Sequence, residues 1–94
     1  MREIEYCRKY LSLEGGGNRE IAYYITVDEI LSASNTVFEN YGVRIKLDNS
    51  EEDLIRGITL SAEKIGFVLQ ALADGTVTPV GLRDVLYDML ELII

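Results

Sequence analysis

The sequence predicts an α+β domain, in which an antiparallel meander of about four strands precedes two C-terminal helices that pack on one face of the sheet. Apolar and polar residues alternate through much of the chain before Ser61, as they do in half-buried strands, and a helical period follows Ser61. A chain of 94 residues has the length of one domain and buries roughly two thirds of its unfolded surface, which is enough for a modest core. We therefore expect one domain over residues 1–94.

The first two strands are predicted over residues 2–14 and 19–28. The first segment is rich in Tyr, Ile and Leu, with polar residues between them. Gly15–Asn18 supplies residues that tolerate a positive φ, which is typical of a hairpin loop. A glycine-rich loop can also bind phosphate, but only where a helix follows, and here a strand follows. The second strand alternates strictly and places one apolar set on one face: Ile21, Tyr23, Ile25 and Val27.

Two further strands are predicted over residues 36–48 and 54–60. Residues 29–35 lose the alternation, so we expect a connection there, with a bulge or a short helical turn. In the third strand Val43, Ile45 and Leu47 point inward, while Arg44 and Lys46 point outward. Residues 49–53 contain three consecutive acids without the ligand spacing and glycine of a calcium loop, which favours a solvated turn.

The two helices are predicted over residues 62–74 and 79–93. Ser61 is expected to cap the first helix, and Gly75 to end it. For the second helix, Thr78 is expected to accept a hydrogen bond from a backbone N–H of the first turn, and Pro79 fits the first helical position. The apolar face of the first helix consists of Ile65, Val68, Leu69, Leu72 and Ala73.

The second helix has an unusually wide apolar arc, because only Asp84, Asp88 and Glu91 form a polar strip. An arc this wide cannot be buried against one flat neighbour. We expect the helix to touch its own sheet on one side and either the preceding helix or a second copy of the chain on the other. Contact with its own domain alone is the alternative. The candidate interface residues are Phe67, Val80, Tyr87, Leu90 and Ile94.

Charge and composition disfavour several kinds of partner. Nine Lys and Arg stand against sixteen Asp and Glu, so the net charge is -7, and no stretch is basic enough to bind nucleic acid or an anionic membrane surface. Met1 leads into a charged segment without an apolar run, so we expect no secretory signal and a cytoplasmic protein. Cys7 is the only cysteine, which makes a small core or sheet residue the expectation for it.

The sequence predicts no catalytic residue and no cofactor. It contains no His, which removes the commonest general base and excludes Ser-His and Cys-His pairs. Ser61 and Lys64 match the S-x-x-K spacing of penicillin-binding enzymes, but the partner motifs are missing, which favours Ser61 as a helix cap. Asp84 and Asp88 lie one helical turn apart and could hold a divalent metal, although such pairs are more typical of a solvated helix face.

Residues 77–90, VTPVGLRDVLYDML, resemble the end of a family of small proteins from Gram-positive, clostridia-like bacteria that is known only as a domain of unknown function. In that family a Val-x-Pro step leads into a helix reading roughly Leu-x-Asp-Val-x-x-Asp. Residues 41–45, YGVRI, resemble its Tyr-Gly-Ile strand. The resemblance implies no activity that could be carried over to these residues.

Three hypotheses about function follow. The first is a non-enzymatic module that binds a protein or a second copy of itself through the wide apolar face of the C-terminal helix. The alternative is a small-molecule or metal-binding domain that uses Asp84, Asp88 and a sheet face. The reserve hypothesis is an acidic mimic of nucleic acid, which ranks low because the acids are interspersed with bases.

Overall fold

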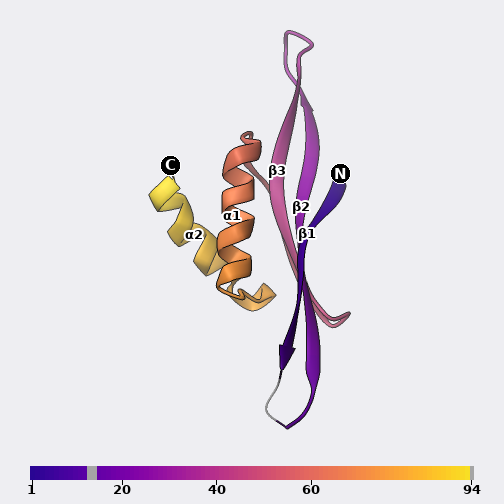
Figure 1. Ribbon diagram of the computed structural model, residues 1–94. Coiled ribbons are helices and arrows are strands. Elements are labelled where there is room, and N and C mark those ends of the chain that lie inside the picture. Colours follow the sequence, from indigo (N-terminus) through magenta and orange to yellow (C-terminus); the bar gives the residue numbers. More distant parts are fainter. Residues whose placement is uncertain (13–14, 94) are drawn as a thin grey trace.

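The computed structural model describes residues 1–12 and 15–93, and it confirms the predicted fold class. Four antiparallel strands form one sheet in the order β1-β2-β3-β4, and both helices lie on the same side of this sheet (Figure 1). The elements, in chain order, are β1 (Arg2–Ser12), β2 (Asn18–Leu31), β3 (Val37–Leu47), β4 (Glu51–Thr59), α1 (Ala62–Asp74), the 3-10 turn η1 (Pro79–Gly81) and α2 (Leu82–Ile93).

The core lies between α1 and the middle of the sheet. The inward alternation predicted for β2 and β3 is confirmed, since Ile21, Tyr23, Val43 and Ile45 are all fully buried. The predicted apolar face of α1 is likewise buried against these strands. Cys7 is half-buried at the margin of this core, as predicted. The hairpin predicted after β1 is also confirmed, because β1 and β2 are antiparallel, while residues 13 and 14 lie outside the described part of the chain.

The connection predicted over residues 29–35 was wrong for its first three residues, because β2 continues to Leu31. Ile30 and Leu31 pair with Phe38 and Val37 of β3, so the backbone ladder persists where the side-chain alternation has ended. Alternation is imposed only where one face of a strand meets a core, and this part of the hairpin extends past the core. The turn itself is closed by a 2.9 Å hydrogen bond from Ser32 N to Thr36 O.

The solvated turn predicted over residues 49–53 was also wrong in part, because β4 begins at Glu51. The chain reverses within Asp48–Ser50, where Asp48 adopts a φ of 51°. The acids that follow are members of the strand and face arginines on other elements. Glu52 pairs with Arg44 of β3, and Asp53 pairs with Arg83 of α2, so the ion pairs offset the low strand propensity of an acidic segment.

The helix boundaries were predicted well, with one error at a cap. Ser61 Oγ accepts a 3.1 Å hydrogen bond from Lys64 N, as predicted, and Gly75 ends α1. Pro79 is the first residue of η1, but the Thr78 side chain makes no capping hydrogen bond, so that prediction was wrong. The chain instead closes a 3-10 turn in which Gly81 N donates to Thr78 O at 3.1 Å, and α2 continues from this turn.

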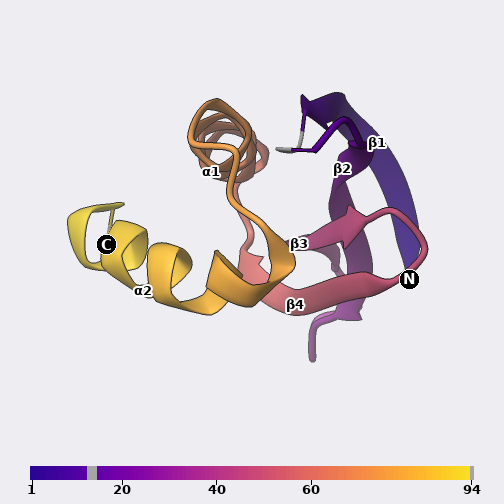
Figure 2. The same cartoon turned by 90° about the horizontal axis from the view of Figure 1, so that it is seen from below.

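Helix α2 lies beside α1 and runs away from the sheet, which is clearest when the molecule is viewed from below (Figure 2). Leu82 and Leu86 are buried at its inner face. The predicted contact with the sheet is made mainly at the start of the segment, where η1 touches β3 and β4 and the Arg83 guanidinium is 3.0 Å from Asp53. The preceding helix is therefore the main neighbour of α2, and contact with a second copy stays a prediction.

Candidate interaction surfaces

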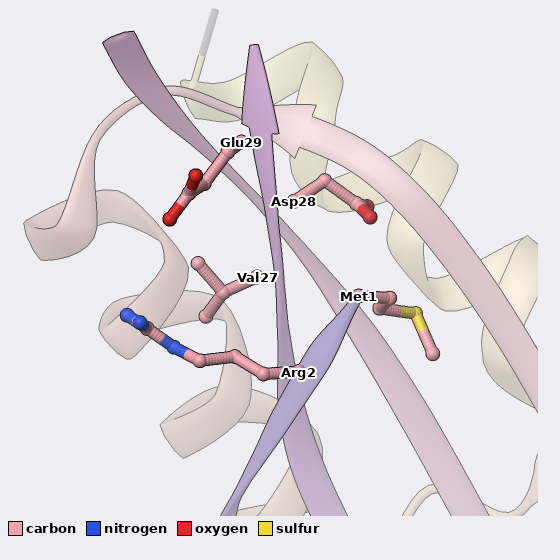
Figure 3. Close-up of a pocket in the computed structure, with 5 residues that line it drawn as sticks. All are labelled: Met1, Arg2, Val27, Asp28 and Glu29. Atoms are coloured by element: carbon pink, nitrogen blue, oxygen red, sulfur yellow. The ribbon is translucent and has the colours of Figure 1, made fainter.

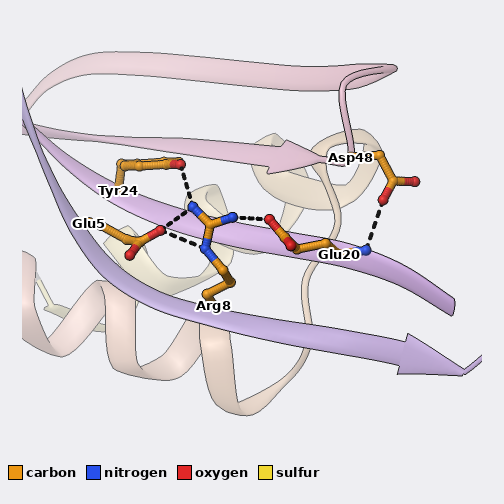
Figure 4. A network of polar contacts seen from close by, with 5 residues as sticks. All are labelled: Glu5, Arg8, Glu20, Tyr24 and Asp48. Atoms are coloured by element: carbon orange, nitrogen blue, oxygen red, sulfur yellow. Dashed lines mark hydrogen bonds and ion pairs between the residues drawn. The ribbon is translucent and has the colours of Figure 1, made fainter.

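The sheet face that is turned away from the helices, called here the outer face, carries rows of paired charges. Arg8 of β1 lies between Glu5 and Glu20 and forms ion pairs with both (Figure 4). Its guanidinium also donates a 3.3 Å hydrogen bond to the Tyr24 hydroxyl, and the Glu20 backbone N–H donates to Asp48 at 2.8 Å. These contacts join β1, β2 and the β3–β4 turn on the outer face.

A second cluster on the outer face is centred on Arg44 of β3. Its Nε lies 2.5 Å from a carboxylate oxygen of Glu3 on β1, and its Nη1 lies 3.1 Å from Glu52 on β4. Beneath these charged side chains, Ala22 and Thr26 of β2 are buried although no helix covers them. The long arginine side chains thus cover the centre of the outer face and neutralise its acids.

The third pair joins Asp28 of β2 to Arg56 of β4, with two hydrogen bonds from the guanidinium. These bonds hold the pKa of the Asp28 carboxyl below its usual range. We expect Arg56→Gln to return this pKa toward the ordinary aspartate value, as measured by an NMR titration of the carboxyl carbon. The control is Arg83→Gln, which removes the partner of Asp53 and should leave the pKa of Asp28 unchanged. An equal change in the Asp28 pKa in both variants would contradict the pairing of Asp28 with Arg56.

Two of the shallow hollows beside β1 are the larger ones among those found in the described part of the chain. The first, about 370 Å³ in volume, lies between β1 and α1 and is lined by Tyr6, Cys7, Lys9, Gln70, Ala73 and Asp74. Its polar groups are already engaged, since Lys9 Nζ donates to Ala73 O and to Thr76 Oγ1, each at 2.8 Å, and the Tyr6 hydroxyl donates to Gln70 at 2.5 Å. Lys9 therefore stabilises the C-terminal end of α1, where its positive charge interacts favourably with the helix dipole.

The second hollow, about 420 Å³, lies where β1 begins beside β2. Arg2, Val27 and Glu29 point to one side of the strands, whereas Met1 and Asp28 point to the other (Figure 3). The hollow is therefore an open notch across the edge of β2. Beyond this notch β2 has no β1 residue to pair with, because β1 begins at Arg2, and β2 pairs only with β3.

The interface residues predicted on the helices are not gathered into one buried site. Phe67, Val80 and Tyr87 are between 62% and 83% exposed, on α1, η1 and α2 respectively. Leu90 is half-buried, and Ile94 lies outside the described residues. Of the polar strip, Asp84 and Asp88 are exposed, while the side chain of Glu91 lies outside the described part. Among the side chains described, no group of three or more His, Cys, Asp or Glu could hold a metal ion.

The sequence analysis missed a group of exposed apolar side chains at the end of the β2–β3 hairpin. The β2–β3 hairpin extends beyond both β1 and β4, and we call this projecting part, residues 28–40, the arm (Figure 1). Its four large apolar side chains are between 40% and 65% exposed: Ile30, Leu31, Val37 and Phe38. The sequence carried a usable signal, because residues 30–38 contain no charge in a chain where 27% of residues are charged.

These features define a small α+β sheet-and-helix domain with an exposed apolar arm and a charge-paired outer face. The chain belongs to a family of unknown function, DUF6514, whose sequence profile matches residues 2–92. This membership confirms the resemblance to a domain of unknown function and assigns no activity. Comparisons with curated proteins and with solved structures gave no significant match. In residues 1–12 and 15–93, no helix has the length and apolar character needed to span a membrane.

Proposed function

We propose that this protein is a non-enzymatic interaction module that associates with protein through exposed apolar side chains. The arm is the observation that carries this proposal. Its apolar side chains occur on both faces of the hairpin, since Ile30 pairs with Phe38 and the neighbouring Leu31 pairs with Val37. No helix or further strand of the described residues pairs with or covers this two-stranded ribbon, so these residues gain only the modest stability of cross-strand pairs in the free monomer. A partner that covers them removes the rest of their apolar surface from water.

The helices offer a second surface for the same function, which the sequence analysis favoured. Helix α2 is anchored at its start by Leu82 and by the ion pair between Arg83 and Asp53, and the rest of it runs away from the sheet. Val80 and Tyr87 are exposed along this segment. A partner that lies against α2 could therefore reach them without displacing any part of the core.

The test compares two variants that remove apolar surface without adding charge. The arm variant carries Leu31→Ser and Val37→Ser, and the helical variant carries Val80→Ser and Tyr87→Ser. We expect the wild-type chain to associate, measured as molar mass by light scattering over a concentration series, and the arm variant to lose this association. Circular dichroism should show an unchanged fold, because all four side chains are exposed.

A loss of association in the helical variant alone would transfer the function to α2. Two results together would refute the proposal. The wild-type chain would be monomeric, and the wild type and both variants would capture the same proteins from a bacterial lysate. The metal and small-molecule alternative has its own readout, since a ligand that binds the native state raises the melting temperature. A shift with a divalent cation that is abolished by Asp84→Asn and Asp88→Asn would favour that alternative.

A further inference from the structure

The arm has open hydrogen-bonding edges. Toward the arm, the β1–β2 ladder ends at the pair Arg2 and Val27, and the β3–β4 ladder ends at the pair Tyr41 and Thr59. Among residues 1–12 and 15–93, no third strand therefore pairs with the arm. The hydrogen bond between Ser32 and Thr36 sets the phase of the ladder, in which bonded and non-bonded pairs alternate. The backbone groups of Val37 and Glu39 on β3 therefore point outward, away from β2.

The β3 edge of the arm is also electrically neutral. Glu39 is its one charged residue, and its carboxylate lies 2.6 Å from the Arg2 guanidinium and accepts a 3.3 Å hydrogen bond from the Tyr41 hydroxyl. The β2 edge carries two acids: Asp28, which is paired with Arg56, and Glu29, for which the described residues supply no ion pair. Two copies of a chain with a net charge of -7 repel each other overall, and the β3 edge adds little to this repulsion because its one acid is paired with an arginine.

We propose that two copies of this chain form a homodimer by pairing the β3 edges of their arms, antiparallel about a two-fold axis at Phe38. This inference rests on the proposed interaction function and names its partner. In this register Val37 of each copy lies opposite Glu39 of the other, and the two residues exchange backbone hydrogen bonds. The register thus satisfies every outward-pointing backbone group of Val37 and Glu39, and no two carboxylates face each other directly.

The side chains fit the same arrangement. Phe38 of each copy faces Phe38 of the other as a non-hydrogen-bonded pair, the closer of the two kinds of cross-strand pair, where an aromatic pair is stabilising. The turn of the second copy then reaches Tyr41 and the end of β4. Leu60, which directly follows the β4 partner of Tyr41, is 60% exposed there and extends the apolar contact.

The first experiment uses charge at the two-fold axis. Phe38→Asp places two carboxylates opposite each other, and Phe38→Lys places two ammonium groups opposite each other, so each variant alone should be monomeric by light scattering where the wild type is a dimer. An equimolar mixture should restore a dimer that contains one copy of each, as native mass spectrometry can show. Tyr10→Asp is the matched control, because Tyr10 is an exposed aromatic residue outside both proposed surfaces, and it should remain a dimer. Val80→Asp tests the helical surface in the same way.

The outcomes separate this inference from the proposed function. A wild type that stays monomeric at millimolar concentration overturns the homodimer, while binding of a different protein would leave the interaction function standing. A dimer that survives both Phe38 variants and is lost in Val80→Asp overturns the arm as the interface and keeps self-association. If each variant is monomeric and the mixture is monomeric too, the two-fold axis at Phe38 is refuted.

A second measurement does not depend on destabilising the interface. In a Cys7→Ala background, Phe38→Cys should form an intermolecular disulfide under mild oxidation, because Cα atoms of a non-hydrogen-bonded pair are about 4.5 Å apart, within the range that a disulfide spans. The matched control is Ile30→Cys, which lies on β2 opposite Phe38 and is similarly exposed. Equal cross-linking of the two variants would contradict pairing through the β3 edge.

Discussion

Gly42→Ala is expected to destabilise the protein by about 3 kcal/mol, which corresponds to a fall of roughly 15 °C in melting temperature for a domain of this size. A Cβ atom at residue 42 would lie 2.3 Å from the backbone oxygen of Ile55 and 2.6 Å from Thr26 Oγ1. The first of these atoms belongs to the backbone of β4 and the second to a fully buried side chain, so neither can move aside cheaply. Thermal unfolding followed by circular dichroism measures the effect.

The close approach at Gly42 comes from a bulge in β4. Gly42 alone separates Tyr41 from Val43 on β3, whereas residues 56–58 separate the corresponding partners on β4. Gly57 at the centre of the bulge has a φ of 68°, which glycine adopts without strain. The bulged strand leaves its ladder opposite Gly42, and its backbone crosses the space that a side chain would otherwise fill.

The control for this prediction is Gly66→Ala in α1. A Cβ atom at residue 66 meets nothing within 4 Å, and alanine is favoured over glycine in a helix interior by about 0.8–1 kcal/mol, so this variant should be more stable than the wild type. The two substitutions add the same atom and should shift the melting temperature in opposite directions. A similar shift in both would contradict the steric explanation for Gly42.

The sequence was sufficient to predict the structure wherever a core imposes a period on the chain. Tyr23 and Ile45 are buried at alternate strand positions and Leu69 at a helical position because each contacts the same core, and the pattern shows this directly. The periodicity fails at Ile30 and at Glu51, which belong to strands without facing that core. There the ladder is held by backbone pairing and ion pairs, and neither leaves a periodic signal in one sequence.

The candidate surface was predictable only in part for the same reason. Phe67 is exposed as predicted, because it falls outside the apolar face of a regular helix. The arm was missed because Ile30, Leu31, Val37 and Phe38 lie on both faces of a ribbon, so they show no alternation and resemble a loop by pattern alone. The bulge opposite Gly42 is a long-range feature, since it depends on the pairing of β4 with β3, and no local motif encodes it.

Raising the pH from 10 to 12 is expected to reduce the stability steeply through Tyr23. This side chain is fully buried in the core, and its hydroxyl donates a 2.9 Å hydrogen bond to Val77 O. Burial is the larger cause and the charge interaction with Cys7 the smaller one, and together they raise the pKa of Tyr23 from 10.0 to about 12. Its contribution to stability is complete below pH 10, where the tyrosine is protonated in both states. Above that pH the unfolded chain loses the proton first, and the free energy of unfolding falls by about 1.4 kcal/mol for each pH unit until the folded pKa is reached.

Tyr23→Phe isolates this effect. At neutral pH the variant should be less stable by about 1–2 kcal/mol, because the Val77 carbonyl loses its hydrogen bond inside the protein. Above pH 10 it should lose less stability than the wild type, so the difference between the two proteins shrinks as the pH approaches 12. Urea unfolding at a series of pH values measures both curves, and Tyr10→Phe, a change at an exposed tyrosine, should follow the wild type throughout. Parallel curves for the wild type and Tyr23→Phe would show that the buried hydroxyl does not titrate with the raised pKa, and the alkaline loss of stability would then belong to the other titrating groups.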